Sequence, residues 1–283
     1  MHIQATASRA ATVLTKRPAL FCRILLAKLN SQRPLPPLPA RRRIGEVIFE
    51  YDMANYHATA PMYFGSYAPL VVGAMRRYLR PGGIFFDVGA NIGYLSAVAA
   101  SLVGPAGQIH AFEPVPAYFA RLCRLAELNP AYNFFTNQSA AGELAGQCPI
   151  FITREPGQNT LVRAYKHEPE IVAKLEVPVE RLDGYISSRQ IDSISLIKID
   201  AEGFELPILK GLAGYFDHSP YRPPIICEIA PRAYPLLGRS VDELHDFMRQ
   251  HSYKPYDLLD GRTPIDLRAL RRVEDVLFLA GTP

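Results

Sequence analysis

Residues 84–96, IFFDVGANIGYLS, place an apolar strand, a tight turn and the start of a helix in direct succession. The strand ends at Val88, and Gly89 and Gly93 enclose a five-residue turn. Glycines let the chain turn sharply and let a ligand approach the backbone. The helix that follows presents free N–H groups at its start. This unit predicts a ligand-binding turn in a fold where strands and helices alternate.

Alternating strand-like and helix-like segments continue along most of the chain. Strands are predicted at 84–88, 108–114, 133–140, 194–200 and 224–230, and helices at 67–79, 92–103, 116–128, 203–212 and 241–253. This alternation indicates an α/β fold, with a doubly wound, mostly parallel sheet covered on both faces. Residues 254–260 and 273–281 predict a terminal antiparallel hairpin at an edge of that sheet. In such sheets the ligand binds beyond the carboxyl ends of the strands.

Two parts of the chain depart from this alternation. Residues 45–53 alternate apolar and polar side chains and predict one strand of an accessory hairpin. Residues 141–190 are less regular, and only 148–154 and 175–182 within them have the composition of strands. We interpret 141–190 as an insertion or an antiparallel extension of the sheet.

The basic residues are concentrated at the start of the chain. Residues 1–43 hold nine Lys and Arg and no Asp or Glu, which leaves 22 of the 31 basic residues against 27 acidic residues in 44–283. We therefore predict a basic, proline-rich N-terminal arm at 1–43 and a single domain at 44–283. Within the arm, 19–29 predicts a short amphipathic helix and 32–43 a stiff linker. Three interpretations stay open: a solvated arm, a segment that docks on a membrane surface or a protein partner, or a transit peptide.

The composition narrows the class of protein. Hydrophobic residues make up 48% and charged residues 20%, as in ordinary globular proteins. The four cysteines form no CxxC pair, which argues against a zinc ribbon or a secreted disulfide framework. No apolar run reaches the roughly 18 residues of a membrane span. We expect a cytoplasmic protein, with peripheral membrane association through the arm as the alternative.

The turn after the first strand has an acid before it. It is spelled D-x-G-x-N-x-G from Asp87 to Gly93, whereas dinucleotide folds use GxGxxG. Asn91 stands where a second glycine would be. An acid at this place repels a phosphate and suits a positively charged ligand. A purely structural strand–helix turn is the alternative.

Glu113 ends the second predicted strand, twenty residues after Gly93. A carboxylate at this place can accept hydrogen bonds from both hydroxyl groups of a ribose. It could equally cap the helix that begins after Pro114. Together with the turn, Glu113 predicts a ligand that contains a ribose, either a nucleotide cofactor or S-adenosylmethionine.

Lys198 and Asp200 fall on one face of the strand at 194–200. A lysine inside a covered parallel strand is destabilising unless an acid pairs with it, and Asp200 or Glu113 could do so. The functional interpretation is that this strand end faces the second substrate. The structural interpretation is a plain ion pair.

Two further acids follow strand ends. Glu202 could belong to the site, or it could favour the N-terminus of the next helix together with Glu205. Glu228 ends the strand at 224–230, where a hydrogen-bonding carboxylate and a site residue are equally open interpretations.

These strand ends resemble the FkbM family of S-adenosylmethionine-dependent methyltransferases. The matching segments are GSYAP (65–69), PGGIFFDVGANIGYLS (81–96), HAFEP (110–114), ISLIKIDAEGFELPILKG (194–211) and ICEI (226–229). DVGANIGY is fairly specific for a methyltransferase of this fold, and its combination with IKIDAEGFE is specific for the family. The resemblance spans about residues 45–257. It implies a class I, Rossmann-like methyltransferase fold and O-methylation of a hydroxyl on a sugar, glycan or secondary metabolite.

The resemblance also implies roles for individual residues. The turn around the methionine part of the cofactor would comprise Asp87, Gly89, Asn91 and Gly93. Glu113 would hold the ribose, and Ser139 and Ala140 would lie against the adenine. The family often has an acid before the proline corresponding to Pro69, where this chain has Ala68.

For catalysis we expect in-line transfer of a methyl group from sulfur to oxygen. Asp200 would orient or deprotonate the acceptor hydroxyl and Lys198 would tune the local charge. Glu202 and Glu228 are secondary candidates. We expect no metal ion, and the alternative is Mg²⁺ bound by Asp200 and Glu228. His110 and His218 have no predicted role, because a lone histidine is usually structural or exposed.

Three other functions remain as alternatives. An NAD(P)-dependent oxidoreductase would share Glu113 but should show GxGxxG. A nucleic-acid methyltransferase acting on amino groups usually has [DN]PP[FY] where this chain has DAEG, and the net acidic domain does not favour a phosphate backbone. A non-catalytic cofactor-binding module is the third.

The predicted partner is a small-molecule or glycan acceptor, and no nucleic acid is expected. The acceptor site would be built from 63–67, 141–180 and 218–224. These segments supply aromatic rings that could stack on a sugar, namely Tyr63, Phe64, Tyr67 and Tyr221.

Overall fold

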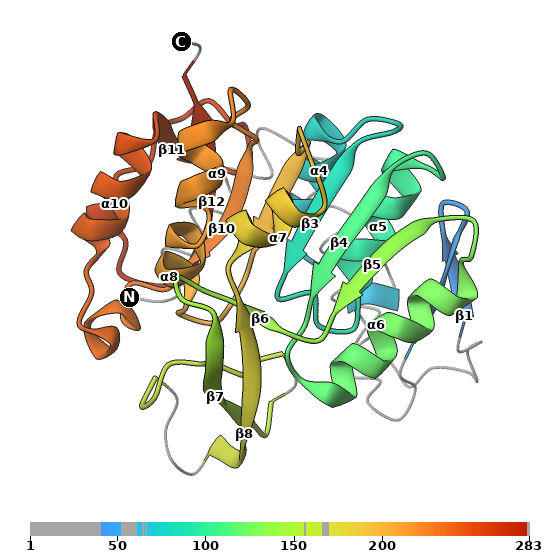
Figure 1. Cartoon of the computed structure of the whole chain (residues 1–283), viewed down its shortest axis with the longest axis horizontal. Helices are drawn as coiled ribbons and strands as arrows, with labels where there is room; N and C mark the ends of the chain where they lie inside the picture. Colours follow the sequence, from blue (N-terminus) through green and yellow to red (C-terminus); the bar gives the residue numbers. More distant parts are fainter. Residues whose placement is uncertain are drawn as a thin grey trace.

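A seven-stranded sheet with the order β11-β12-β10-β9-β3-β4-β5 forms the centre of the molecule (Figure 1). The computed structural model describes residues 41–51, 61–63, 65, 67–155, 157–165 and 170–281. The strands of the seven-stranded sheet are β3 (Ile84–Val88), β4 (Gln108–Phe112), β5 (Asn133–Asn137), β9 (Leu196–Ile199), β10 (Ile225–Ile229), β11 (Tyr253–Asp257) and β12 (Glu274–Ala280). The predicted mostly parallel α/β sheet is confirmed.

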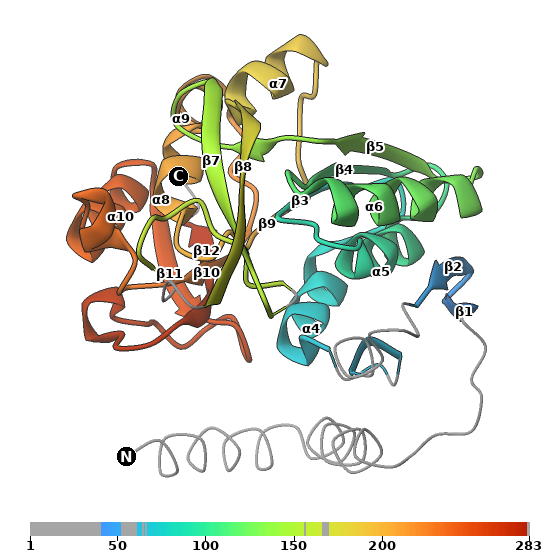
Figure 2. The same ribbon diagram turned by 90° about the horizontal axis from the view of Figure 1, so that it is seen from below.

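Helices cover both faces of this sheet. They are α4 (Pro69–Tyr78), α5 (Tyr94–Val103), α6 (Pro116–Leu128), α7 (Leu182–Ser188), α8 (Glu205–Lys210), α9 (Ala213–His218) and α10 (Val241–Gln250), with the 3-10 helices η2 (Tyr234–Leu237) and η3 (Leu267–Ala269). Figure 2 shows α4 and α5 on one face and α7 and α9 on the other. Because side chains alternate along a strand, Phe85 packs in one core and its neighbour Phe86 in the other.

The predicted terminal antiparallel hairpin is confirmed: β11 and β12 form it at one edge of the sheet. β12 pairs antiparallel with both β10 and β11, so it lies inside the sheet and β11 forms the edge. Within the seven-stranded sheet, β12 is therefore the one strand that runs antiparallel to its neighbours. The carboxyl ends of β3, β4, β9 and β10 still point in one direction, as parallel pairing requires.

Most predicted boundaries differ from the structure by a few residues, and four differences affect the description of the fold. The strand expected at 133–140 ends at Asn137, and the one expected at 175–182 ends at Glu180. The helix expected at 203–212 is the shorter α8, and α9 follows as a further helix after Gly211, where an added Cβ would lie 2.2 Å from the carbonyl oxygen of Gly142. The fourth difference is α7, which lies inside the segment expected to be irregular.

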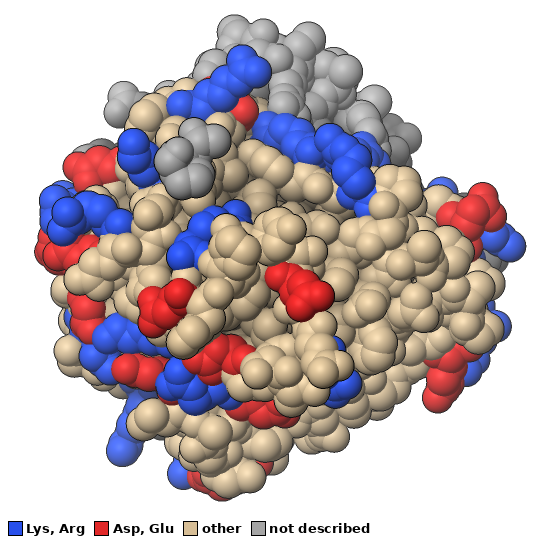
Figure 3. Space-filling view, turned by 45° about the horizontal axis from the view of Figure 1, so that its top comes forward, with Lys and Arg blue, Asp and Glu red and all other residues tan. Residues whose placement is uncertain are grey.

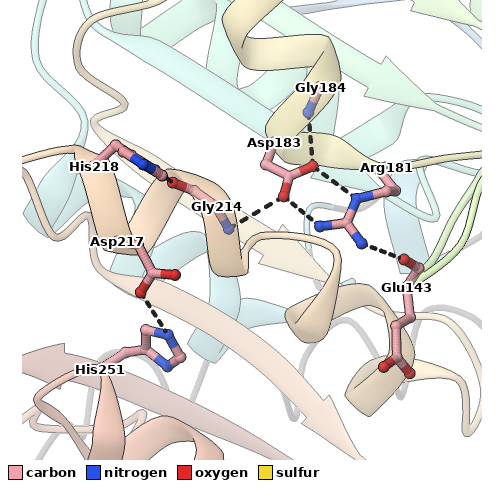
Figure 4. Close-up of polar contacts among 8 residues, drawn as sticks. All are labelled: Glu143, Arg181, Asp183, Gly184, Gly214, Asp217, His218 and His251. Atoms are coloured by element: carbon pink, nitrogen blue, oxygen red, sulfur yellow. Dashed lines mark hydrogen bonds and ion pairs between the residues drawn. The ribbon is translucent and has the colours of Figure 1, made fainter.

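The insertion forms a separate three-stranded sheet, ordered β6-β8-β7. Its strands are β6 (Ala140–Ala141), β7 (Gly146–Thr153) and β8 (Ile171–Glu180). Arg181, directly after β8, donates hydrogen bonds to both oxygens of Asp183, at 3.1 and 2.6 Å, and to the carbonyl oxygen of Glu143 at 2.6 Å (Figure 4). Asp183 also accepts the N–H of Gly214 in α9 at 3.1 Å. Arg181 and Asp183 thus join the insertion to the helix layer.

The predicted accessory hairpin consists of β1 (Arg41–Ile44) and β2 (Val47–Glu50). β2 packs against α5 and α6. Arg41–Arg43, expected to end the linker at 32–43, instead form most of β1, so the predicted boundary between residues 43 and 44 falls inside this hairpin. The helix predicted at 19–29 and the rest of the arm lie outside the described residues. Among the helices of the described ranges, none has the length and apolar character to cross a membrane.

Candidate active site

A pocket of about 830 Å³, its open mouth included, lies at the carboxyl ends of β3, β4 and β9. Its walls come from the turn after β3, the ends of β4 and β9, the segment before α4, and the insertion. All three predicted cofactor-binding segments, which are the turn at 87–93, Glu113 and 139–140, contribute residues to this pocket. The topology of the parallel strands therefore brings together residues that lie more than a hundred positions apart, such as Gly89 and Asp200.

Backbone geometry explains why the turn after β3 contains two glycines and an asparagine. Gly89 has a φ of 78°, and an added Cβ would lie 1.9 Å from the carbonyl oxygen of Asp200. Gly93 has a φ of 82°, and an added Cβ would lie 2.9 Å from Leu122 Cδ1. Asn91 has a φ of 52°, and its side-chain oxygen Oδ1 accepts the N–H of Ile92 at 2.7 Å. Asparagine tolerates this left-handed conformation better than most residues do.

Asp87 lies beneath the turn and does not line the pocket. Its side chain is fully buried. Oδ2 accepts the hydroxyl hydrogen of Ser96 in α5 at 2.6 Å, and Oδ1 lies 3.5 Å from Lys198 Nζ. The structure therefore places Asp87 where it supports the turn, and direct contact with a cofactor stays a prediction.

Lys198 connects the turn to two carboxylates. Its Nζ donates to the carbonyl oxygen of Gly89 at 2.9 Å and lies 3.4 Å from Asp200 Oδ2. Burial works against the charge of Lys198, but Asp200 and Asp87 outweigh burial and raise its pKa above the usual range. The lysine is therefore charged, and it fixes the end of β9 against the turn after β3.

Glu113 lines the pocket with both carboxylate oxygens engaged. Oε2 accepts the N–H of Asn91 at 2.8 Å, and Oε1 accepts the N–H of Val115 at 2.8 Å. Burial raises the pKa of Glu113 to about 7, even though both N–H groups favour the ionised form. An ionised carboxylate has about four acceptor positions, so about two remain for ligand hydroxyl groups.

Ser139 and Ala140 lie in the same pocket, as the resemblance implies. Ser139 is 1% exposed, and its Oγ has no hydrogen-bond partner within the described part of the chain. A buried hydroxyl without a partner is destabilising. A ligand with a polar edge at this place would satisfy it, which is a fit to the adenine of S-adenosylmethionine.

Asp200, Glu202 and Glu228 form an acidic cluster at the ends of β9 and β10. One oxygen of each lies within 4.8 Å of the others, close enough for the three to hold a metal ion together. The predicted metal pair of Asp200 and Glu228 is thus brought together, and Glu202 joins it. Burial, followed by Asp200 and Glu202, raises the pKa of Glu228 to about 10. Without a cation, Glu228 is therefore neutral at pH 7.

Glu202 reaches this cluster through an unusual backbone conformation. Glu202 has a φ of 49° and Gly203 a φ of 104°. The fully buried Glu205 accepts the N–H of Gly203 at 2.7 Å and the hydroxyl of Tyr234 at 3.2 Å. Thr160, in the insertion, donates its hydroxyl to the carbonyl oxygen of Glu202 at 2.7 Å. These contacts hold the turn after β9 in place.

The insertion contributes more to the pocket than its irregular sequence indicated. Gly157, Asn159 and Leu161, between β7 and β8, line the pocket wall. An added Cβ on Gly157 would lie 3.2 Å from Nδ2 of Asn91, so this loop closely approaches the turn after β3. The residue types of the loop carry no motif, and only the fold brings it to the pocket.

The predicted acceptor segments have different outcomes. Tyr67 lines the pocket, and burial, together with Asp200, raises its pKa to about 12. Tyr63 lies outside this pocket, and Phe64 lies outside the described residues. In the loop at 218–224, Tyr221 is exposed and no residue lines the pocket.

The two histidines without a predicted role are not in the pocket. His110 stacks between the rings of Phe86 and Phe135, with centroids 4.8 and 4.6 Å away. Burial lowers its pKa to about 4, so it is a neutral core residue. His218 is exposed and its Nδ1 contacts the carbonyl oxygen of Gly214 (Figure 4).

Sequence comparison gives a family match. The model of the methyltransferase FkbM domain matches residues 87–255, more than half of the chain. Among curated relatives, the 31-O-demethyl-FK506 methyltransferase FkbM of Streptomyces tacrolimicus is 32% identical over 160 residues, which is 47% of this chain and 61% of the relative. Methyltransferase 1 of Beauveria bassiana is 30% identical over 142 residues, which is 44% of this chain and 57% of the relative. The match thus spans about three fifths of each relative.

Comparison of this chain with solved structures gives a weaker similarity. A methyltransferase FkbM from Methylobacillus flagellatus KT has 16% sequence identity and a TM-score of 0.42, with 92% of this chain and 60% of that chain covered. A likeness at this level does not bear on function.

Proposed function

Because the chain belongs to the FkbM methyltransferase family, whose domain model covers the pocket-forming strands, we propose that it transfers a methyl group from S-adenosylmethionine to a hydroxyl group. The acceptor is a sugar, a glycan or a secondary metabolite. The observation that carries the proposal is the convergence of a glycine turn, a ribose-type carboxylate and an unpartnered buried hydroxyl in one pocket, beside Asp200. The name of the Streptomyces relative, a 31-O-demethyl-FK506 methyltransferase, supports transfer to oxygen.

Each part of the cofactor has a group in this pocket that would hold it. The turn from Gly89 to Gly93 would surround the methionine part. Glu113 would accept the ribose hydroxyls, and Ser139 and Ala140 would lie against the adenine. When bound, S-adenosylmethionine supplies a methyl group on a positively charged sulfur.

The residues at the end of β9 would position the acceptor. Asp200 lines the pocket with its side chain 34% exposed, so it can reach an incoming hydroxyl group. It orients that hydroxyl and takes its proton as the oxygen attacks. Lys198 holds Asp200 at the end of the strand, and Tyr67 keeps its hydroxyl hydrogen and can donate it to the acceptor. Glu202, on the same pocket wall, is the secondary candidate.

A Mg²⁺-dependent variant of this reaction has one specific observation in its favour. The oxygens of Asp200, Glu202 and Glu228 are close enough to share a cation, and oxygen ligands suit Mg²⁺. A bound cation would replace the proton that Glu228 otherwise carries at neutral pH. Unchanged methylation after treatment with a chelator would remove this variant.

The other candidate functions are less well supported. The turn at Gly89–Gly93 lacks the GxGxxG spacing of an NAD(P)-dependent oxidoreductase. On the face drawn in Figure 3, Lys and Arg are interspersed with Asp and Glu, which does not form a continuous basic surface there for nucleic acid. A cytoplasmic location and a docking role for the N-terminal arm remain proposals.

Calorimetric titration with S-adenosylhomocysteine tests the cofactor directly. We expect micromolar binding to the wild type and at least tenfold weaker binding to Glu113→Ala. Glu127→Ala is the matched control, because Glu127 is an exposed residue of α6 that pairs with Arg124 on the surface. If the wild type binds NADH but not S-adenosylhomocysteine, the proposal is wrong.

A further inference from the structure

A second groove lies beside the proposed methyl-transfer pocket and shares a wall with it. The groove has a volume of about 1210 Å³, its open mouth included, and lies between the β1–β2 hairpin, α4 and α5. Met62 and Tyr94 line both the groove and the pocket. The groove and the pocket therefore adjoin at these two side chains, and a ligand that spanned both would pass them on its way to Asp200.

The groove is lined by arginines. Arg42 and Arg43 come from β1, and Arg76 comes from the last turn of α4. Arg43 forms an ion pair with Glu46 at 2.8 Å. Arg42 donates to the carbonyl oxygen of Tyr63 at 2.7 Å, and within the described ranges no carboxylate pairs with Arg42 or Arg76. These two guanidinium groups thus keep donors that match a carboxylate, sulfate or phosphate.

An aromatic wall connects the groove to the pocket. The ring of Tyr63 lies 4.9 Å from Tyr51, and Tyr51 lies 4.9 Å from Phe49. Phe49 lies 5.6 Å from Tyr94, and Tyr94 lies 5.5 Å from Tyr67 in the pocket. Each distance joins ring centroids. These rings are mostly buried and pack edge-to-face, so they form a rigid wall, to which Tyr51, Tyr63 and Tyr94 contribute the atoms that line the groove.

The charges of the groove and of the pocket have opposite signs. No acidic residue lines the groove among the described residues, whereas Asp200 and Glu202 line the pocket. An acceptor with a negative group at one end is attracted by the arginines and repelled by the carboxylates. Its uncharged hydroxyl end then points towards Asp200.

We propose that this groove binds the methyl acceptor through an anionic group held by Arg42 and Arg76. The acceptor is then an acidic glycan or metabolite that carries a carboxylate, sulfate or phosphate apart from the methylated hydroxyl. The proposal rests on the proposed function and narrows its substrate class. It also explains why the groove and the pocket share Tyr94 as a common wall.

The test uses three probes, each titrated into the full chain with and without S-adenosylhomocysteine. Trigalacturonate offers carboxylates, glucose 6-phosphate offers a phosphate, and maltotriose is the neutral counterpart. We expect at least one anionic probe to bind tenfold more tightly than maltotriose, and to bind more weakly as salt is added.

Substitutions locate the binding. Arg76→Gln should weaken binding of the anionic probe at least fivefold, because Arg76 is exposed and lines the groove. The control is Arg124→Gln, which removes an exposed arginine of α6 outside the groove and should change the affinity less than twofold. Both variants should keep the thermal midpoint of the wild type.

Three results would overturn the proposal: equal affinity for charged and neutral probes, no binding of either anionic probe at millimolar concentration, or equal losses in Arg76→Gln and Arg124→Gln. The proposed function fails separately. Binding of an anionic probe without binding of S-adenosylhomocysteine would refute the cofactor and keep the groove as a site for acidic ligands. The reverse pattern would refute the groove alone.

Discussion

The proposed cofactor side of the pocket and the proposed acceptor side, which includes the adjoining groove, are built in different ways. The cofactor side consists of the turn from Gly89 to Gly93 and of Glu113, which accepts the N–H of Asn91 in that turn. The acceptor side is assembled from the β1–β2 hairpin, the segment before α4 and a loop of the insertion. The shape of the cofactor side is determined by the backbone conformation of a few neighbouring residues. The shape of the acceptor side is determined by packing between segments that are distant in the sequence.

This difference shows how strongly the structure restricts the choice of residue on each side. On the cofactor side, positive φ angles and close backbone contacts leave little choice of residue. On the acceptor side, aromatic and arginine side chains project from the scaffold and could be exchanged without breaking a strand. Substitutions should therefore damage folding on the first side and selectivity on the second.

The largest expected effect is that of Gly89→Ala. Gly89 and Gly82 both have a φ of 78°, but an added Cβ would lie 1.9 Å from the Asp200 carbonyl oxygen at Gly89 and would meet nothing within 4 Å at Gly82. The left-handed conformation alone should lower the free energy of unfolding by ~1–2 kcal/mol in Gly82→Ala. The added clash should raise the loss to at least about 3 kcal/mol in Gly89→Ala and abolish cofactor binding. Urea unfolding and calorimetry measure both, and equal losses in the two variants would contradict this account.

Asp200→Asn should have the next largest effect, on turnover alone. We expect methylation to fall ~100-fold or more, because the amide cannot take the acceptor proton. The affinity for S-adenosylhomocysteine should stay within a few-fold. Glu228→Gln is the matched variant, because Glu228 is already neutral at pH 7 and should tolerate the change. A large loss in Glu228→Gln would instead favour the Mg²⁺-dependent variant, and normal turnover in Asp200→Asn would remove Asp200 from the mechanism.

Glu113 should make cofactor binding depend on pH. Its pKa is raised to about 7, so the carboxyl group gains a proton as the pH falls through 7 and accepts ribose hydroxyls less well. From pH 8 to pH 6, the affinity for S-adenosylhomocysteine should fall up to about tenfold. Glu113→Gln should bind weakly with a flat profile. A wild-type profile that is flat across this range would show that Glu113 does not contact the cofactor.

Much of the fold could be predicted because the signals are local. Apolar strands followed by glycine or proline turns predicted β3, β4, β9 and β10 within a few residues. The position of β12 could not be read in this way, because its pairing with β10 depends on contacts that the sequence pattern does not contain. The end of α8 at Lys210 has the same origin. Gly211 allows the close approach of Gly142, from the insertion, which the local sequence does not reveal.

The residues of the candidate site could also be predicted only in part. Lys198, Asp200 and Glu113 follow from polar residues at the ends of apolar strands. The burial of Asp87 beneath the turn, and the left-handed conformation that brings Glu202 beside Asp200, depend on tertiary packing. The contribution of the insertion loop could not be predicted because its residues carry no motif. The roles of these residues in binding and catalysis stay predictions.

The last expected effect is on the pH dependence of stability, and it belongs to Glu205, which supports the turn after β9. Burial raises the pKa of Glu205 to about 8, from 4.5 in an exposed glutamate. Between these pH values the unfolded chain has released the proton that the folded chain keeps. The wild type should therefore lose stability as the pH rises from 4.5 to 8, by up to about 1.4 kcal/mol per pH unit from this group.

Glu205→Gln keeps an oxygen for the N–H of Gly203 and removes this titration. Its free energy of unfolding, measured in urea at pH 5, 6, 7 and 8, should depend less on pH than that of the wild type. Above pH 8 the variant should be at least as stable. Glu113 and Glu228 also have raised pKa values and titrate in both proteins, so the difference between the two slopes isolates Glu205. Parallel slopes would mean that Glu205 is ionised in the folded protein, and that one more negative charge acts on Glu228 in the acidic cluster.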